Sequence, residues 1–151
     1  MKPEVMLPPT LLNSDNPARL YSPSQVGGVS FFFGFPLAGA ILISSNYKTL
    51  GESGLRFRTL IIGIVLTIFA LIISFRLPEE FVSAVPFLSM VVMYFWAKSA
   101  QLDFYEKFIA AGGYRHSILR VCIIGILALV CVIFIAIPVF LLGDSFGWFT
   151  A

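Results

Sequence analysis

The longest apolar stretches of this sequence lack ionisable side chains altogether. Asp, Glu, His, Lys and Arg are absent from residues 26–45, 59–75, 81–97 and 121–143. Transporters, proton relays and intramembrane metalloproteases normally place such residues inside the membrane, where they replace the water around an ion, a proton or a metal. Their absence predicts no metal site and no cofactor, and it argues against these classes of activity.

Charge is scarce in the rest of the chain as well. Charged residues make up 12% of the sequence and hydrophobic residues 58%, with a mean hydropathy of +0.93, whereas a soluble domain carries about 25% charged residues. The formal net charge of +2 is too small to indicate nucleic acid, because phosphate backbones are bound by clustered Lys and Arg. The lipid bilayer is the expected partner, and no nucleic-acid partner is predicted.

Motifs of the common enzyme families are missing too. The sequence has no Gly-rich phosphate loop, no paired carboxylates and no Ser-His-Asp set, and His116 is its only histidine. Cys122 and Cys131 lie in one apolar stretch at a spacing that turns them to opposite faces of a helix, which excludes a bridge within that helix. These absences predict a protein that is not an enzyme.

The sequence does contain four stretches of the right length to cross a membrane. A hydrocarbon core of about 30 Å is spanned by about 20 apolar residues in a helix. The sequence therefore predicts an all-α, polytopic membrane protein whose single domain, residues 26–143, contains four transmembrane helices. Their expected bounds are 26–45, 59–75, 79–98 and 118–142.

The third helix is expected to be longer than the membrane is thick. It should start at Pro78, because proline in the first turn of a helix loses no hydrogen bond, and continue as a cytoplasmic extension to about Ala111, where glycines stop it. In that extension Phe104 and Phe108 share one face with Ala111. This pattern is typical of a helix that lies on lipid or on a partner protein.

The two ends of the chain are predicted to lie outside the transmembrane domain. Residues 1–25 contain five prolines among Asn, Ser and Asp, so a flexible, extended N-terminal tail is expected. Residues 144–151 are expected to form a short C-terminal segment at the membrane interface, with Trp148 in the aromatic belt.

Lys and Arg are unevenly distributed between the two predicted sides of the membrane. Most of them flank the two long loops between helices, and these are Lys48, Arg56, Arg58, Lys98, Lys107, Arg115 and Arg120. The opposite side would hold only Lys2, Arg19 and Arg76. The positive-inside rule then predicts that both long basic loops are cytoplasmic and that both termini face outward.

Small residues recur on one face of each of the first two predicted helices. They are Ser30, Gly34 and Ala38 on the first helix and Gly63, Thr67 and Ala70 on the second. Small side chains let two helix backbones approach closely, so van der Waals contact can drive helix association in lipid. The pattern predicts that these two helices pack together, either within one chain or between copies of it.

Short motifs occur along the chain in a recognisable order. They are Leu20-Tyr21-Ser22-Pro23 with Gln25, Gly34 with Pro36-Leu37-Ala38-Gly39, Asn46-Tyr47 with Leu50-Gly51, Leu77-Pro78-Glu79, and Ala110-Ala111-Gly112-Gly113 with Arg115, Ser117 and Arg120. In these residues the sequence resembles a family of small, uncharacterised bacterial inner-membrane proteins. It departs from that family at Leu119, where tryptophan is frequent. The resemblance implies a multi-pass protein of the bacterial inner (cytoplasmic) membrane and no catalytic residue.

Three functions are compatible with these features. The leading hypothesis is a non-enzymatic accessory or scaffold subunit, or a self-associating helical bundle, that binds another membrane protein or copies of itself. Candidate contacts with lipid headgroups or with that partner are Lys48, Arg56, Arg58, Lys107, Arg115, His116 and Arg120. One alternative is an oligomeric pore lined by Ser, Thr and Gly faces. The other is a lipid-acting enzyme at the interface, with Asn46 and Tyr47 added to the arginines and the histidine of that set.

Overall fold

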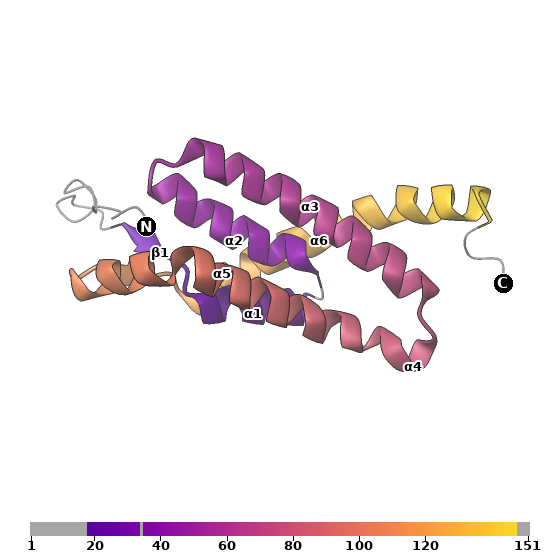
Figure 1. Cartoon of the computed structure of the whole chain (residues 1–151), viewed down its shortest axis with the longest axis horizontal. Helices are drawn as coiled ribbons and strands as arrows, with labels where there is room; N and C mark the ends of the chain where they lie inside the picture. Colours follow the sequence, from indigo (N-terminus) through magenta and orange to yellow (C-terminus); the bar gives the residue numbers. More distant parts are fainter. Residues whose placement is uncertain (1–17, 34, 148–151) are drawn as a thin grey trace.

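The computed structural model describes residues 18–33 and 35–147, which are helical over most of their length (Figure 1). The elements are β1 (Arg19–Leu20), α1 (Pro23–Phe32), α2 (Pro36–Thr49), α3 (Ser53–Arg76), α4 (Glu79–Val82), α5 (Ala84–Ala110), β2 (Tyr114–Arg115) and α6 (Ile118–Ser145). The two short strands pair in parallel, with Arg19 opposite Tyr114 and Leu20 opposite Arg115. Apart from this small pairing, the fold is all-α, as predicted.

Three helical segments among the described residues are long and apolar enough to cross a membrane: α3, α4 together with α5, and α6. They correspond to the predicted second, third and fourth spans. The interruption at Ser83 between α4 and α5 follows from Pro86, which has no N–H to bond the carbonyl of Val82. After α5 ends, Gly112 has a φ of 87°, a left-handed conformation that glycine adopts without strain.

The first predicted span does not form a single helix. In place of one helix over 26–45, the chain forms α1, of 10 residues, and α2, of 14 residues. At 1.5 Å per residue these helices are about 15 and about 21 Å long, so neither one crosses a hydrocarbon core of about 30 Å. The prediction of four spans is therefore corrected to three candidate spans and a helical hairpin.

Pro36 explains why the first span is divided. Phe35 is extended, with φ −141° and ψ 151°, which is the conformation that a residue before proline prefers. Pro36 then occupies the first turn of α2, where its missing N–H costs no hydrogen bond. α1 starts in a similar way: Ser22 and Gln25 form a capping box around Pro23. Both helices of the hairpin thus begin at a proline.

α1 and α2 fold back on each other as an antiparallel pair. The Cβ position of Gly39 in α2 faces the Ser30 hydroxyl in α1. At the open end of the pair, Asn46 near the end of α2 bonds the backbone of Tyr21, just before α1. The chain therefore enters α1 and leaves α2 at the same end of the molecule. We call α1 and α2 the re-entrant hairpin, and we call this end, which also holds the α2–α3 and α5–β2 connections, the loop end (left in Figure 1).

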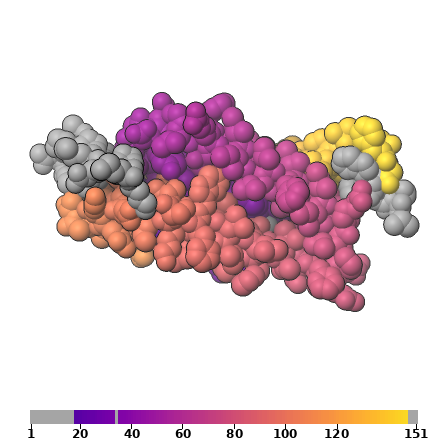
Figure 2. All heavy atoms as spheres, viewed as in Figure 1, coloured from indigo at the N-terminus to yellow at the C-terminus, as the bar shows by residue number. Residues whose placement is uncertain are grey.

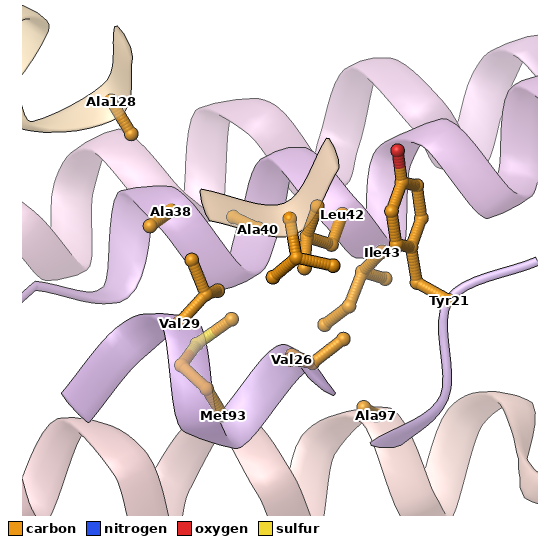
Figure 3. Packing of buried hydrophobic residues seen from close by; sticks show 11 residues of the cluster. Tyr21, Val26, Val29, Ala38, Ala40, Leu42, Ile43, Met93, Ala97 and Ala128 are labelled. Atoms are coloured by element: carbon orange, nitrogen blue, oxygen red, sulfur yellow. The ribbon is translucent and has the colours of Figure 1, made fainter. Parts of the chain in front are cut away.

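The re-entrant hairpin is the centre of the fold. α5 packs along α1, α3 packs along α2, and α6 contacts both hairpin helices. On the face shown in Figure 2, α5 covers α1 almost completely. Figure 3 shows Val26 and Val29 of α1 and Ile43 of α2 pointing into a common core with Met93 of α5. The long helices thereby bury most of α1 and α2, whereas Phe31 and Phe32 at the end of α1 remain exposed.

α3 fixes the tip of the re-entrant hairpin. The Thr67 hydroxyl accepts a hydrogen bond from the Leu37 N–H at 2.9 Å and donates one to the Gly63 carbonyl at 2.8 Å. Gly63 lies directly against Ala40, because a Cβ at Gly63 would overlap with the Cβ of Ala40. The small-residue face of α3 therefore packs on α2 within one chain.

The hairpin also changes the predicted side of the N-terminal region. A four-span chain would place both termini opposite the long basic loops, whereas β1 pairs with β2 and brings Arg19 and Leu20 to the loop end. Arg19 consequently joins the basic residues of the long loops. Arg76, in the last turn of α3, stays at the opposite end. The expectation that the N-terminal segment lies on the side opposite the basic loops is corrected accordingly.

Residues 18–25, which were predicted to belong to a flexible tail, are part of the packed structure. Leu20 and Tyr21 are each 1% exposed. Leu20 packs against Phe104 and Phe108, so these two residues of the apolar face of the α5 extension, which was expected to lie on lipid or on a partner, are covered by the chain's own N-terminal segment, while Ala111 is exposed. Residues 1–17 and 148–151, with the rest of the predicted tail and Trp148, lie outside the described part of the chain.

Candidate functional site

A buried polar cluster joins the open end of the re-entrant hairpin to α5. Asn46 Oδ1 accepts from the Tyr21 N–H at 2.8 Å, while Asn46 Nδ2 donates to the Tyr21 carbonyl at 2.9 Å and to Gln101 Oε1 at 2.9 Å. Gln101 Nε2 donates to the Ile43 carbonyl at 3.1 Å. Both amide side chains are buried and hydrogen-bonded, as buried polar groups need to be. The cluster fixes the positions of the segments around it at the loop end.

Tyr21 and His116 form a stacked layer beside this cluster. Their ring centroids are 4.2 Å apart and their planes differ by 26°. The His116 N–H donates to the Leu20 carbonyl at 3.1 Å, and the His116 carbonyl accepts from Gln25 Nε2 at 2.8 Å. The connection between β2 and α6 is thereby attached to both β1 and α1.

A pocket of about 550 Å³ lies at the loop end next to His116. Three segments of the chain line it: the start of β1, the last two turns of α2, and the β2–α6 connection with the first turn of α6. The lining residues are Ala18, Arg19, Ser45, Lys48, Thr49, His116, Ser117 and Arg120. We call it the basic pocket, because Lys and Arg side chains line it from all three segments.

The charges in the basic pocket have one sign. Arg19, Lys48 and Arg120 reach it from β1, α2 and α6, and no carboxylate is among its lining residues in the described part of the chain. The Ser117 hydroxyl caps α6 by accepting from the Arg120 N–H at 3.4 Å, so the positive end of the α6 dipole adjoins the same space. Guanidinium, ammonium and hydroxyl donors are the groups that bind phosphate oxygens. The basic pocket is therefore suited to an anion.

His116 contributes an uncharged ring to this pocket. Burial of the imidazole, followed by the charges of Arg120 and Arg19, lowers the pKa of His116 to about 4, and a hydrogen bond to the Arg19 backbone opposes this in part. Burial raises the pKa of Tyr21, while Arg120 acts in the opposite direction. The buried Tyr21 hydroxyl has no well-formed hydrogen bond within the described residues, so Arg120 acts on it mainly through its charge. Both rings are neutral at pH 7.

The structure brings some of the predicted contact residues together and separates others. Lys48, His116 and Arg120 line the basic pocket. The other predicted contacts are exposed and do not line the pocket, and these are Arg56, Arg58, Lys107 and Arg115. Among the predicted packing residues, Ser30, Ala38, Gly63 and Thr67 are buried, Ala70 is partly buried, and Gly34 lies outside the described residues.

The sequence reasoning missed Arg19 and the hydroxyl residues Ser45, Thr49 and Ser117. A single first helix that runs through Pro36 would place Arg19 on the side opposite the basic loops. Its strand partner is far along the chain, and no local pattern predicts such a pairing. The Ser-Pro-x-Gln sequence at residues 22–25 is nevertheless a helix-start pattern. It would have placed Arg19 just before a helix rather than within a tail.

Comparisons with protein-family models, with curated proteins and with solved structures find no match to this chain. The family resemblance noted in the sequence stays a prediction. The fold and the basic pocket are therefore the basis on which a function is proposed.

Proposed function

We propose that this protein is a non-enzymatic integral membrane protein that binds the phosphate group of an anionic lipid in its basic pocket. The observation that carries the proposal is the convergence of Arg19, Lys48 and Arg120 on one pocket at the end of helices long enough to cross a bilayer. A Lys or Arg near a membrane surface is attracted to anionic lipid by about 1 kcal/mol. A pocket that gathers three of them adds shape and hydroxyl donors to that attraction.

The position of the basic pocket along the helices favours a lipid as its occupant. Lys48 is in the last turn of α2 and Arg120 is in the first turn of α6, so the pocket lies where helices leave the hydrocarbon. Next to Arg120, Ile118 and Leu119 are 68% and 72% exposed. Acyl chains packed against these two side chains would place a headgroup phosphate at the level of the pocket.

The polar residues of the loop end support binding better than reaction. Asn46, which an interfacial lipid enzyme would use, is fully engaged in the buried polar cluster, and His116 is held in a stack. Two of the polar groups that an oligomeric pore would use are also engaged, because the buried Ser30 hydroxyl bonds the Val26 carbonyl and the buried Thr67 hydroxyl bonds the Leu37 N–H. A lipid-binding accessory or scaffold protein therefore has more support than either alternative.

We place the loop end at the cytoplasmic face of a bacterial inner membrane. With Arg19 at that end, nearly all basic residues of the described chain lie there, which is the distribution that the positive-inside rule associates with the cytoplasm. In this setting the lipid belongs to the inner leaflet. The bound lipid and the exposed helix faces then form the surface that the protein presents to another membrane protein or to a second copy.

Counting the lipids that stay bound tests the proposal. Protein purified in mild detergent is mixed with equal amounts of anionic and zwitterionic lipid, and bound lipid is counted by native mass spectrometry. The wild type should retain the anionic lipid preferentially. The double variant R19Q/R120Q should lose at least about tenfold in anionic lipid retention, because each lost charge removes about 1 kcal/mol of attraction.

A matched control separates the basic pocket from general surface charge. R56Q/R58Q removes the same formal charge from exposed positions in the first two turns of α3, outside the pocket. This variant should retain anionic lipid within about twofold of the wild type, because neither arginine lines the pocket, although both are as exposed as Arg19 and Arg120. Equal losses in the two double variants, or equal retention of both lipid classes by the wild type, would contradict the proposal.

A further inference from the structure

The charge of the basic pocket discriminates between kinds of phosphate. Arg19, Lys48 and Arg120 carry three formal positive charges, and His116 adds none at pH 7. A phosphodiester brings a single negative charge, which leaves most of this positive charge uncompensated. A phosphate monoester brings about 1.5 to 2 negative charges at pH 7, together with three terminal oxygens that accept hydrogen bonds.

We infer that the basic pocket selects a phosphate monoester over a phosphodiester. The three cations approach from three different elements, so each terminal oxygen of a monoester can face a separate cation. The Ser117 hydroxyl and the positive end of the α6 dipole lie on the same side of the pocket. A diester, with two of its four oxygens esterified, leaves part of these donors unused.

This inference rests on the proposed function and names the chemistry of its ligand. The monoester can come from a lipid, such as phosphatidic acid or an isoprenyl phosphate, or from a soluble compound, such as glycerol 3-phosphate. The exposed apolar side chains of Ile118 and Leu119 beside the pocket favour the lipid source. Competition distinguishes the two sources, because a soluble monoester that is the natural ligand should displace bound lipid from the pocket.

The pH dependence of binding follows from the groups that face the ligand. The charged groups that face the ligand are Arg19 of β1, Lys48 of α2 and Arg120 of α6. The pKa of His116, about 4, and the raised pKa of Tyr21 keep both rings neutral between about pH 5.5 and about pH 7.5. The group that titrates in this range is the monoester itself, whose second pKa is about 6. Its affinity should therefore rise with pH, while that of a diester stays constant.

The test compares lipids that share the same acyl chains. Wild-type protein in detergent is titrated with phosphatidic acid, phosphatidylglycerol, cardiolipin and phosphatidylcholine, and the bound fraction is measured by native mass spectrometry. At about pH 7.5, phosphatidic acid should bind about tenfold more tightly than phosphatidylglycerol, a ratio that corresponds to about 1.4 kcal/mol. The ratio should shrink toward one at about pH 5.5, where the monoester has lost most of its second charge.

Two variants connect the preference to the pocket. Lys48→Gln should reduce the ratio between the two lipids, because it removes one of the cations that compensate the second charge. Lys107→Gln, at an exposed position of α5 outside the pocket, should leave the ratio unchanged. Thermal unfolding of each variant in the same detergent verifies that it is folded.

The outcomes separate this inference from the proposed function. Equal binding of phosphatidic acid and phosphatidylglycerol, with both reduced in R19Q/R120Q, would overturn the monoester inference and leave lipid binding intact. Tighter binding of cardiolipin than of phosphatidic acid would overturn it as well, because the two charges of cardiolipin are on separate phosphates. Failure of every anionic lipid to bind would overturn both. If glycerol 3-phosphate displaces the bound lipid, the ligand is a soluble monoester. If it does not, the ligand is the lipid.

Discussion

The side-chain amide of Asn46 bonds both the N–H and the carbonyl of Tyr21 and also the side chain of Gln101. At the scale of single residues, this amide supplies hydrogen-bond partners to the backbone of Tyr21, which precedes α1 at the open end of the hairpin. Removing it leaves the Tyr21 backbone and the Gln101 side chain buried with fewer hydrogen bonds, and unsatisfied buried groups cost more than the net value of the bonds themselves.

Replacement of Asn46 should therefore be costly. Asn46→Ala is expected to lower the free energy of unfolding in detergent by about 2–4 kcal/mol, measured by denaturant titration. Ser99→Ala serves as the control, because it removes one exposed hydrogen bond to the Trp96 carbonyl and should change stability by less than about 0.5 kcal/mol. Similar effects of the two substitutions would show that the buried cluster does not hold the hairpin.

His116 gives the fold a dependence on pH. The pKa of an unperturbed histidine is 6.5, and burial beside Arg120 and Arg19 lowers that of His116 to about 4. As the pH falls below 6.5, the unfolded chain takes up a proton that the folded chain does not bind until about pH 4. The contribution of His116 to stability is therefore complete above pH 6.5 and is lost between pH 6.5 and about pH 4.

A phenylalanine at position 116 tests this dependence, since it can stack on Tyr21 but cannot titrate. Between about pH 7.5 and about pH 5, the thermal unfolding midpoint of the wild type should fall further than that of His116→Phe. The carboxylates of the chain affect both proteins equally, so the difference between them isolates His116. Parallel decreases in the two midpoints would contradict the neutral, buried state of its ring.

At the scale of secondary structure, apolar length predicted α3, α5 and α6 but did not predict the hairpin. A run of about 20 apolar residues without breaks has one solution in lipid, a spanning helix. Residues 26–45 have the same length but contain Pro36. Proline also occurs within spanning helices, as Pro138 does in α6. The contacts that decide between a span and a hairpin, Asn46 with Tyr21 and Thr67 with Leu37, join distant parts of the sequence.

The close approach of α2 and α3 depends on a glycine. Gly63→Ala should destabilise the protein by about 1–3 kcal/mol, because its Cβ would overlap with Ala40 and the two backbones would have to separate. Gly54, on the same helix, has no atom within 4 Å of the position of a Cβ. Gly54→Ala should be neutral or stabilising by up to about 1 kcal/mol. The free energies of unfolding of the two variants are compared in detergent. Equal effects of both substitutions would contradict the close packing of α2 and α3.

At the scale of the whole molecule, the three long helices are arranged around the re-entrant hairpin and make most of their contacts with it. The same arrangement builds the basic pocket, because the hairpin returns Lys48 to the end of the molecule where Arg19 and Arg120 lie. From the sequence, Lys48, His116 and Arg120 could be predicted as interfacial residues by their position beside apolar stretches. Arg19 could not be predicted as such a residue, because it lies at the loop end only if α1 and α2 fold back as a hairpin.

The topology of the hairpin is the central claim, and cysteine labelling tests it most directly. In a C122A/C131A background, which removes both exposed native thiols, single cysteines are introduced at Ala18, Glu52 and Glu79. Each variant is treated with a membrane-impermeant maleimide in vesicles of known orientation. If α1 and α2 re-enter as a hairpin, Ala18→Cys and Glu52→Cys will react from the same side of the membrane and Glu79→Cys from the other. Reaction of Ala18→Cys from the side of Glu79→Cys would mean that residues 26–45 cross the membrane once, and would contradict this structure.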